Sequence, residues 1–401
     1  MKITITGVTG FVGKLLYSSL IQAFDEVSLI SRNKAKLMKE YPNADCFDYT
    51  ELSSALKETD IVLHLAAINS NSNLPEKEFN KINADLLLKI AKSAKNENVK
   101  RFINITSFHI LDDKNQTYYA NSKRRGIAML TSMNWPAIEN VYLPAVYGNS
   151  WSGDLSPLNL FPLALSKTLF AAISAFKPTL NIKLLIEYVL NPPGETRMNN
   201  NGILLYDDKS KNLFYSILKR ILDLTFVLFI SVFFSWLMIL VWVCIRSTSK
   251  GPGLFVQTRL GKDQKPFKCY KFRTMYDGTL DVGTHEAATS SITPIGQFLR
   301  KTKIDELPQI INIVRNELSL VGPRPCLPHQ VEVKNQRAVF GAFKVKPGIT
   351  GFSQINNIDM STPTKLAEYD FLYIAQRGLL YDIKIIIATA LGNGQGDKVK
   401  K

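Results

Sequence analysis

The sequence predicts an α/β fold in its first half, followed by a membrane-embedded helix and a second soluble unit. Short β-rich runs alternate with helical segments up to about residue 208, which is typical of a Rossmann-like doubly wound parallel sheet. The first of these runs ends in a glycine turn. Residues 224–245 then form 22 consecutive positions without a charged side chain.

The first half provides enough strands and helices for such a sheet. Strands are expected at residues 2–6, 26–31, 44–47, 60–66, 99–106 and 141–143. Helices are expected between them, at residues 15–23, 34–40, 51–58, 79–96 and 122–132.

The glycine turn has the spacing of a dinucleotide-binding fingerprint. Gly7 permits a tight turn after the first strand, Gly10 lets the backbone approach a pyrophosphate, and Gly13 lets helix and strand pack closely. After the second strand, such folds usually carry an acidic residue for the ribose hydroxyls, but this chain has Arg32. A guanidinium suits a 2′-phosphate, so NADP(H) is favoured over NAD(H). A solvated surface arginine is the alternative interpretation.

A candidate acid/base group follows the fifth strand. Ser107 ends that strand, and Tyr119 and Lys123 stand four residues apart, which places them on one face of a helix. A nearby ammonium lowers the pKa of a phenol, so Tyr119 is expected to exchange a proton with a carbinol or ketone. Tyr215 and Lys219 have the same spacing and are assigned no role.

These motifs, together with DIVLHLAA, Asn83 and LPAVYG, resemble the extended short-chain dehydrogenase/reductases, the NAD-dependent epimerase/dehydratase family, over residues 1–208. The resemblance implies that Ser107 binds the substrate oxygen, that Tyr119 is the acid/base and that Lys123 holds the nicotinamide ribose, with Asn83 nearby. The dehydratases' Asp-Glu pair is replaced by Phe108-His109. Reduction of a nucleotide keto-sugar with NADPH is therefore expected, and a 4-epimerase or a non-catalytic nucleotide-binding scaffold are the alternatives.

The apolar run is long enough to cross a bilayer, at roughly 33 Å as a helix. Lys219 and Arg220 precede it and Arg246 and Lys250 follow it, so neither end is the obvious outer end. We interpret residues 209–220 as a linker with a lead-in helix and 221–246 as a re-entrant anchor. A single crossing helix is the alternative.

Composition indicates the kind of partner. The net charge of +15 implies anionic partners, for which lipid headgroups and phosphorylated substrates are better candidates than nucleic acid, since no nucleic-acid motif is present. The four cysteines lie far apart, which indicates reduced thiols without a disulfide framework or a metal-binding spacing.

Residues 247–401 contain a second set of charged motifs. Asp305 and Glu306 precede Pro308, a pattern typical of a helix N-terminus, so capping is the simple interpretation. Paired carboxylates there can also hold Mg²⁺ with substrate phosphates, or accept a phosphoryl group. Phosphoryl transfer needs charge neutralisation, which Lys271, Arg273 and Arg324 can supply.

Residues 216–390 closely resemble the bacterial sugar transferases, monotopic phosphoglycosyl transferases with a small α/β domain. The resemblance implies a cytoplasmic-face enzyme of the inner (plasma) membrane. With Mg²⁺, it would move a sugar-1-phosphate from a UDP-sugar onto polyprenyl (undecaprenyl) phosphate. Asp305 would be the covalent nucleophile and Glu306 its partner. Lys271, Arg273, Arg324 and Asp370 would lie on the substrate-phosphate side.

The chain departs from this family at two places. Ser235-Trp236 stands where the family's anchor breaks at Ser-Pro, and Asn356-Asn357-Ile358 stands where many members have Asn-Gly-Arg. The combined expectation is a bifunctional membrane enzyme of surface glycan synthesis. The identity of the sugar and the oligomeric state stay open.

Overall fold

The chain folds into two compact units that do not divide it at a single point. The computed structural model describes the chain apart from residues 149–150, 152, 193–196, 199–201, 280–290 and 395–401. The first unit comprises residues 1–170 and 178–207, and the second comprises residues 171–177 and 208–401. The chain therefore enters the second unit briefly after residue 170 and permanently after residue 207.

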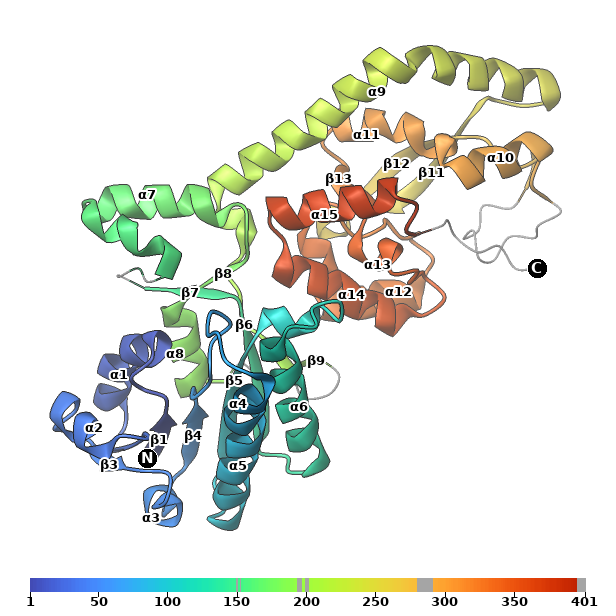
Figure 1. Ribbon diagram of the computed structural model, residues 1–401. Helices are drawn as coiled ribbons and strands as arrows, with labels where there is room; N and C mark the ends of the chain where they lie inside the picture. Colours follow the sequence, from blue (N-terminus) through green and yellow to red (C-terminus); the bar gives the residue numbers. More distant parts are fainter. Residues whose placement is uncertain (149–150, 152, 193–196, 199–201, 280–290, 395–401) are drawn as a thin grey trace. The chain divides into compact units, whose positions relative to one another are not determined.

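The first unit is built on an eight-stranded sheet (Figure 1). Its order is β3-β2-β1-β4-β5-β6-β10-β9, and every neighbouring pair is parallel except β10 and β9. The strands are β1 (Lys2–Thr6), β2 (Glu26–Ile30), β3 (Asp45–Phe47), β4 (Ile61–His64), β5 (Arg101–Ser107), β6 (Ile138–Leu143), β9 (Arg197–Met198) and β10 (Gly202–Leu204). A separate parallel pair joins β7 (Ala145–Tyr147) to β8 (Thr179–Asn181).

Helices connect the strands of this sheet. They are α1 (Phe11–Ala23), α2 (Lys34–Glu40), α3 (Leu52–Leu56), α4 (Glu76–Asn80), the π-helical η1 (Lys81–Leu86), α5 (Leu87–Asn96), α6 (Tyr118–Ser132) and α8 (Ile182–Leu190), with 3₁₀ segments η2 (Phe108–Leu111) and η3 (Gly153–Leu160). Helix α7 (Leu163–Ser174) begins in the first unit and ends in the second.

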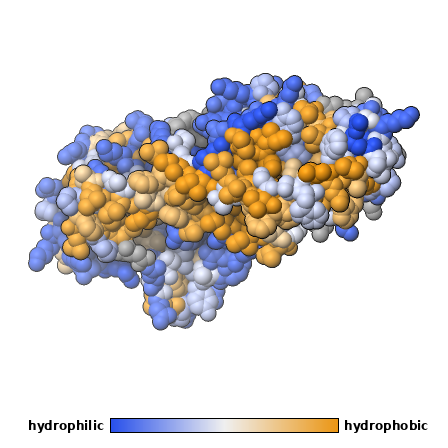
Figure 2. Space-filling view, turned by 90° about the horizontal axis from the view of Figure 1, so that it is seen from above, coloured by the Kyte–Doolittle hydropathy of each residue, from blue (hydrophilic) through white to orange (hydrophobic). Residues whose placement is uncertain are grey.

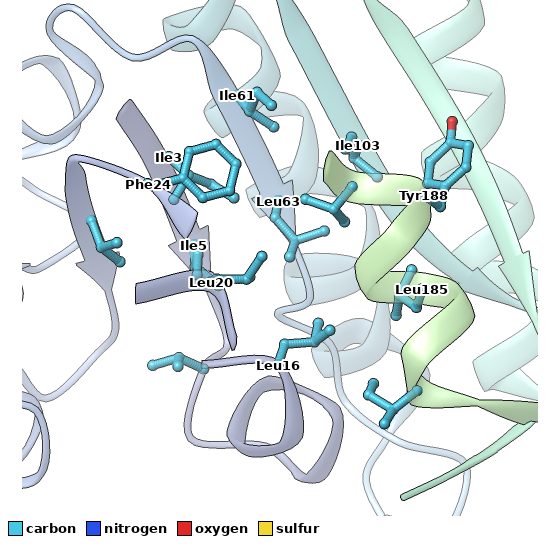
Figure 3. Close-up of a cluster of buried hydrophobic side chains, with 14 of the residues drawn as sticks. Ile3, Ile5, Leu16, Leu20, Phe24, Ile61, Leu63, Ile103, Leu185 and Tyr188 are labelled. Carbon is cyan, nitrogen blue, oxygen red and sulfur yellow. The ribbon is translucent and has the colours of Figure 1, made fainter. Parts of the chain in front are cut away.

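Two hydrophobic clusters hold the helices to the sheet. In one of them, α1 and α8 pack on β1, β4 and β5, and its members Leu16, Leu185 and Ile5 have no exposed surface (Figure 3). The other places α3, α5 and α6 around Phe102 and Leu87. Helices thus cover both sides of a parallel sheet, and the predicted doubly wound fold is confirmed.

Four strands of the first unit were not predicted from the sequence. β7, β8, β9 and β10 are two or three residues long, too short for a periodic pattern. β10 nevertheless extends the main sheet by pairing with β6.

The second unit contains two small sheets and several helices. The sheets are the antiparallel pair β11 (Leu254–Leu260) and β12 (Pro266–Phe272) and the parallel pair β13 (Ser319–Val321) and β14 (Gly348–Thr350). The helices are α9 (Leu213–Thr248), α10 (Pro294–Thr302), α11 (Ile310–Val314), α12 (Val331–Val339), α13 (Phe352–Ile355), α14 (Pro363–Gln376) and α15 (Leu379–Ala390). Shorter 3₁₀ segments are η4 (Lys209–Lys211), η5 (Lys262–Gln264), η7 (Ile304–Gln309) and η8 (Ala342–Lys344).

Helix α9 runs unbroken for 36 residues, about 54 Å at 1.5 Å per residue. The expected lead-in and the apolar run are therefore one helix, which continues through Ser235-Trp236 and bends along its length in Figure 1. Asn212 begins it as an N-cap, accepting a hydrogen bond from the Tyr215 N–H.

Both ends of α9 pack on the second unit. Near its start, Lys219 Nζ forms an ion pair with the buried Asp382 carboxylate at 2.9 Å. One turn later, Asp223 accepts hydrogen bonds from Ser319 Oγ and Leu320 N–H, at 2.9 and 2.8 Å. Near its end, Val241 and Ile245 are buried in a cluster with Phe272 and Leu299.

The outward surface of α9 is apolar. Apolar side chains gather over this helix in Figure 2. The most exposed large ones include Leu228, Val232, Trp236 and Ile239, each more than 60% exposed. Over its most apolar 18-residue window, only 17% of the helix is buried. Length and composition are sufficient for membrane insertion.

The buried Asp223 carboxylate gives a test of how α9 is held. Asp223→Ala would leave the Ser319 hydroxyl and the Leu320 N–H buried without an acceptor, so the free energy of unfolding should fall by about 1–3 kcal/mol. Thermal unfolding of the detergent-solubilised protein measures this. Glu332→Ala, on an exposed position of α12, is the matched control and should unfold like the wild type. Equal unfolding temperatures for both variants would contradict the assignment.

Candidate functional site

The glycine turn of the first unit has the geometry that the sequence predicts. Gly7 has φ +75°, and a Cβ there would lie 2.6 Å from the Ala66 nitrogen. A Cβ on Gly13 would lie 2.5 Å from the Val8 Cα, so helix α1 can approach the turn only without a side chain. Gly10 is the N-cap of α1, and its N–H bonds to the Gly7 carbonyl at 3.0 Å. The N-terminus of α1 therefore lies at the carboxyl end of β1, where a pyrophosphate can bind.

The predicted acid/base residues come from β5 and α6. Ser107 ends β5, and Tyr119 lies in the first turn of α6, which Thr117 caps by accepting from the Ala120 N–H. Tyr119 and Ser107 interact through their side chains, and His109 lies edge-on to the Tyr119 ring with centroids 6.5 Å apart. Ser107 and Tyr119 are twelve positions apart in the sequence, and the fold brings their two hydroxyls together.

The loop that spans this interval is held by Arg124. Its guanidinium donates to the carbonyls of Ile110, Asp112 and Asn115 at 2.7 to 3.1 Å. Sequence reasoning did not single out Arg124, because a guanidinium that binds backbone carbonyls and the Asn121 side chain leaves no motif. It fixes the loop relative to α6 and so positions Tyr119.

Lys123 and Asn83 are both buried. Lys123 Nζ donates to the Ile105 carbonyl at 3.4 Å, and burial lowers the pKa of Lys123 to about 8. Asn83 accepts from the Ile68 N–H at 2.9 Å and donates to Ser122 Oγ at 3.0 Å. Asn83 therefore ties the loop after β4 to helix α6, and its role in this structure is to position other groups.

One electrostatic expectation for Tyr119 is wrong in this structure. The sequence predicts that Lys123 lowers the pKa of Tyr119, but burial raises that pKa, and only the Ser107 hydroxyl opposes the rise. Tyr119 and Lys123 share one face of α6, yet the Lys123 ammonium is directed to the Ile105 carbonyl.

Arg32 is exposed after β2, close enough to Tyr49 for its charge to lower the pKa of that phenol against a larger rise from burial. Its side chain is on the surface at the carboxyl end of β2. The position suits a nucleotide contact, which stays a prediction.

In the second unit, Glu306 is the centre of a buried charge cluster. Its Oε1 accepts from Lys271 Nζ at 2.8 Å and from Arg324 Nη2 at 3.0 Å. Burial alone would raise the pKa of Glu306, but these two cations hold it well below its usual range. Lys271 comes from β12, Glu306 from η7 and Arg324 from the segment after β13, so three separate parts of the unit converge here.

Asp305 is 8% exposed and differs from its neighbour. Among the described residues its carboxylate has no hydrogen-bond partner, and η7, whose N-cap residue is Lys303, has no side-chain cap. The capping interpretation of Asp305 is therefore wrong. Burial raises the pKa of Asp305 to about 6, the Glu306 charge adds to the rise, and Lys271, Arg300 and Arg324 oppose it.

Both carboxylates line a cavity of about 1080 Å³. The basic residues among its described lining are Arg259, Lys271, Arg273, Arg300, Lys301, Lys303, Arg324 and Lys365, and the acidic ones are Asp277, Asp305, Glu306 and Asp359. The excess of basic side chains suits a diphosphate.

Arg273 is buried at the wall of this cavity. Its Nη2 donates to the carbonyl and hydroxyl of Ser249, at 3.1 and 2.7 Å, directly after α9. Its Nε and Nη1 have no hydrogen-bond partner in the described structure. A buried guanidinium with free N–H groups in a cavity wall can bind an anion.

Asp370 does not line the cavity, and its expected place on the substrate-phosphate side is wrong. It is 1% exposed and accepts from Arg337 Nε at 2.8 Å and Ser353 Oγ at 3.2 Å. Arg337 in turn donates to the Arg324 carbonyl at 2.6 Å. Asp370 therefore stabilises Arg324 indirectly, through Arg337.

Asn312 is a second supporting residue that the sequence analysis did not identify. It is fully buried, accepts from the Tyr270 N–H at 3.2 Å and donates to the Lys268 carbonyl at 2.7 Å. These bonds fasten α11 to β12 and so fix Lys271 relative to Glu306. A lone Asn within the apolar run IINIV was the available signal.

Comparisons with known proteins identify the second unit. The family model described as "Bacterial sugar transferase" matches residues 214–393. The uncharacterized sugar transferase EpsL of Bacillus subtilis is 37% identical over 173 residues, covering 43% of this chain and 85% of that protein. The chain belongs to the bacterial sugar transferase family.

A second relative of this sugar transferase is longer. The UDP-glucose:undecaprenyl-phosphate glucose-1-phosphate transferase of Klebsiella pneumoniae is 38% identical over 194 residues, covering 45% of this chain and 41% of that protein. The chain therefore spans about two fifths of the length of that relative.

The sequence departs from the family's Asn-Gly-Arg at Asn357 and Ile358, and both residues lie in the cavity wall. Asn357 has φ +56°.

The first unit of this sugar transferase matches the "NAD dependent epimerase/dehydratase family" over residues 3–163. The expected resemblance is thereby confirmed. Among solved structures, UDP-glucuronic acid 4-epimerase from Bacillus cereus in complex with NAD is 17% identical with a TM-score of 0.40, covering 51% of this chain and 77% of that one.

Proposed function

We propose that the second unit transfers a sugar-1-phosphate from a UDP-sugar to undecaprenyl or another polyprenyl phosphate at the cytoplasmic face of the inner membrane. The observation that carries the proposal is the buried Asp305 carboxylate, which has no hydrogen-bond partner in the described part of the chain and lies beside a neutralised Glu306 in a basic cavity. Relatives named as transferases of glucose-1-phosphate to undecaprenyl phosphate support it.

The chemistry proceeds in two displacements. An Asp305 carboxylate oxygen attacks the phosphorus that carries the sugar, and the bond between that phosphorus and the bridging oxygen breaks, so UMP leaves with the electron pair. A polyprenyl phosphate oxygen then attacks the same phosphorus and the aspartyl bond breaks, which regenerates Asp305 and yields polyprenyl diphospho-sugar. The carboxylate thus acts as a covalent phosphoryl acceptor.

The basic side chains neutralise the charge of this reaction. Lys271 and Arg324 are already held by Glu306, so they need no reorganisation when the diphosphate binds. Arg273 offers its free N–H groups.

Mg²⁺ would rest on Asp305, Glu306 and substrate phosphates, where it would neutralise negative charge on the phosphoryl oxygens. The described residues include no group of three or more His, Cys, Asp or Glu side chains suited to a metal, so the two carboxylates would hold Mg²⁺ together with oxygens of the substrate.

The membrane proposal rests on α9. Residues near its two ends are fixed to one soluble unit, by Asp223 at one end and by Val241 and Ile245 at the other. A helix that crossed the bilayer would separate its ends by the membrane thickness and could not keep both contacts. An apolar helix held along one soluble unit fits insertion into one leaflet, with residues 209–220 leading into the anchor at 221–246 and residues 247–401 forming the catalytic domain.

We further propose that residues 1–208 reduce a nucleotide keto-sugar with NADP(H), with Tyr119 as the proton donor. The adjacent Ser107 and Tyr119 side chains support this, as does the buried Lys123, which can bind the ribose hydroxyls of a nicotinamide nucleotide. A 4-epimerase is the second candidate, because the same residues serve hydride transfer in either direction. The two units together would complete a sugar and load it onto lipid.

Replacement of Asp305 tests the nucleophile. Asp305→Asn keeps the size of the side chain but removes the anionic oxygen, so UMP release should fall by roughly 10³-fold or more. UMP release from a panel of UDP-sugars with polyprenyl phosphate measures the loss. Glu332→Gln, an exposed carboxylate on α12, serves as control and should keep full activity. Near wild-type release by Asp305→Asn would overturn the assignment.

The raised pKa of Asp305 predicts a pH dependence. The folded-state pKa of about 6 lies above the ordinary 3.8, so the carboxylate is ionised above pH 6 and becomes protonated as the pH falls through 6. The burst of UMP without lipid acceptor should therefore lose half its rate near pH 6. Glu306→Gln removes a repelling charge while Lys271 and Arg324 stay, so the midpoint should move to lower pH. An unchanged midpoint in that variant, or a wild-type midpoint near 4, would refute the explanation.

Tyr119→Phe tests the first unit. Without the hydroxyl, NADPH-dependent reduction of UDP-4-keto-sugars should fall about 10²-fold or more while NADPH binding persists. Tyr118→Phe, at the exposed neighbouring position, should react like the wild type. Oxidation of NADPH and NADH at equal concentrations reports the cofactor preference. Wild-type protein that binds NADPH but reduces no keto-sugar would favour the scaffold, and interconversion of C4 epimers would favour the epimerase.

A further inference from the structure

Helix α7 has an exposed apolar stripe that the proposed reactions do not use. Leu165, Leu169 and Ile173 stand at i, i+4 and i+8 and are 46%, 37% and 46% exposed. Leu163 and Phe176 extend the exposed apolar surface at either end, at 50% and 42%. The buried residues of the helix, Ser166, Phe170 and Ser174, lie on the side next to this stripe. Five exposed large apolar side chains within 14 residues indicate that this surface binds a partner.

The last turn of α7 is fixed beside the start of α9. Asn212, the N-cap of α9, donates through Nδ2 to the Ala171 carbonyl and to Ser174 Oγ, both at 2.8 Å. Ala175 packs with Tyr215 of α9 in a buried cluster. The end of the stripe therefore continues into the exposed apolar start of α9, where Leu213 is 70% exposed.

Backbone hydrogen bonds make this connection rigid. The N–H groups of Leu379 and Leu380, at the start of α15, donate to the carbonyls of Ala175 and Phe176 at 3.0 and 3.2 Å. A Cβ on Gly378 would lie 2.7 Å from the Phe176 carbonyl oxygen, so the two segments are in closest backbone contact there. Residues 171–177 are thus an integral part of the second unit.

Basic residues lie opposite the apolar stripe and beyond its end. Lys167 is on the opposite face of α7, Lys177 follows the helix, and Lys211 precedes α9, and all three are exposed. An apolar helical stripe with lysines on the opposite face and beyond its end is typical of a helix that lies in the plane of an anionic membrane surface.

We propose that the exposed face of α7 is a second membrane contact, an interfacial helix that binds the surface of an anionic bilayer. This rests on the proposed membrane insertion of α9, with which the end of α7 is continuous. The bilayer fits better than a protein partner because the stripe joins the start of the helix that the membrane itself would bind.

Position-specific fluorescent probes on the full-length protein test this. The two partly exposed cysteines are first replaced, as Cys46→Ser and Cys244→Ser, which leaves two buried thiols. Leu165→Cys then places an environment-sensitive dye on α7. Met38→Cys, 57% exposed on α2, is the aqueous control, and Trp236→Cys, 63% exposed on α9, is the membrane reference.

The labelled proteins are reconstituted in vesicles of phosphatidylethanolamine and phosphatidylglycerol, with nitroxide-labelled acyl chains or aqueous iodide as quenchers. The Leu165 dye should emit to the blue of the Met38 dye, with quenching by the lipid nitroxide and protection from iodide. A Leu165 dye quenched by iodide like the Met38 dye, while the Trp236 dye contacts lipid, overturns the α7 proposal alone.

Two further outcomes separate the possible failures. An aqueous signal from the Trp236 dye would overturn the proposed insertion of α9 and the α7 proposal together. A Leu165 dye protected from both quenchers would indicate cover by protein, such as a second copy of the chain, and would also refute the bilayer as occupant. Replacing Lys167 and Lys177 by Glu should reduce the lipid quenching of the Leu165 dye and leave that of the Trp236 dye unchanged.

Discussion

The pairing of Glu306 with Lys271 and Arg324 is the interaction on which the site of the second unit depends. It joins β12, η7 and the segment after β13 through one carboxylate oxygen. Each partner is largely buried, so removal of one would leave an uncompensated charge at a cost of about 3–5 kcal/mol. Because Glu306 takes both cations, Asp305 is left as a buried carboxylate without a hydrogen bond to any described residue, as the proposed role of nucleophile requires.

A layer of buried polar residues behind the cavity keeps this arrangement. Asn312 fixes β12 to α11, and Asp370 fixes Arg337, which holds the Arg324 carbonyl. Five of the residues predicted from the sequence line the cavity, namely Lys271, Arg273, Asp305, Glu306 and Arg324, but Asp370 was expected on the substrate side and is instead buried away from the cavity. A motif shows which residues occur together in sequence. It does not show whether a carboxylate faces substrate or a buried guanidinium, because both environments select the same residue.

The first unit shows a similar limit of sequence reasoning. Strand–helix alternation and the glycine spacing were sufficient to predict the sheet and its nucleotide turn, because both arise from local backbone constraints. The four missed strands are two or three residues long and form only through pairing with distant partners. The pKa of Tyr119 was likewise beyond prediction, since four-residue spacing places Lys123 on the same face but does not fix where its flexible ammonium points.

The path of the chain shows that the two halves are not joined by a single linker. It leaves the first unit after residue 170, returns after 177 and leaves again after 207. The excursion supplies backbone acceptors to α15 and contacts to the N-cap of α9, so the transferase unit includes a segment from within the first half. A boundary at residue 208, the natural choice from sequence, would remove those acceptors and expose the buried Tyr215 and Leu379 cluster. The second unit is therefore complete only when the first-half segment that contains α7 is present.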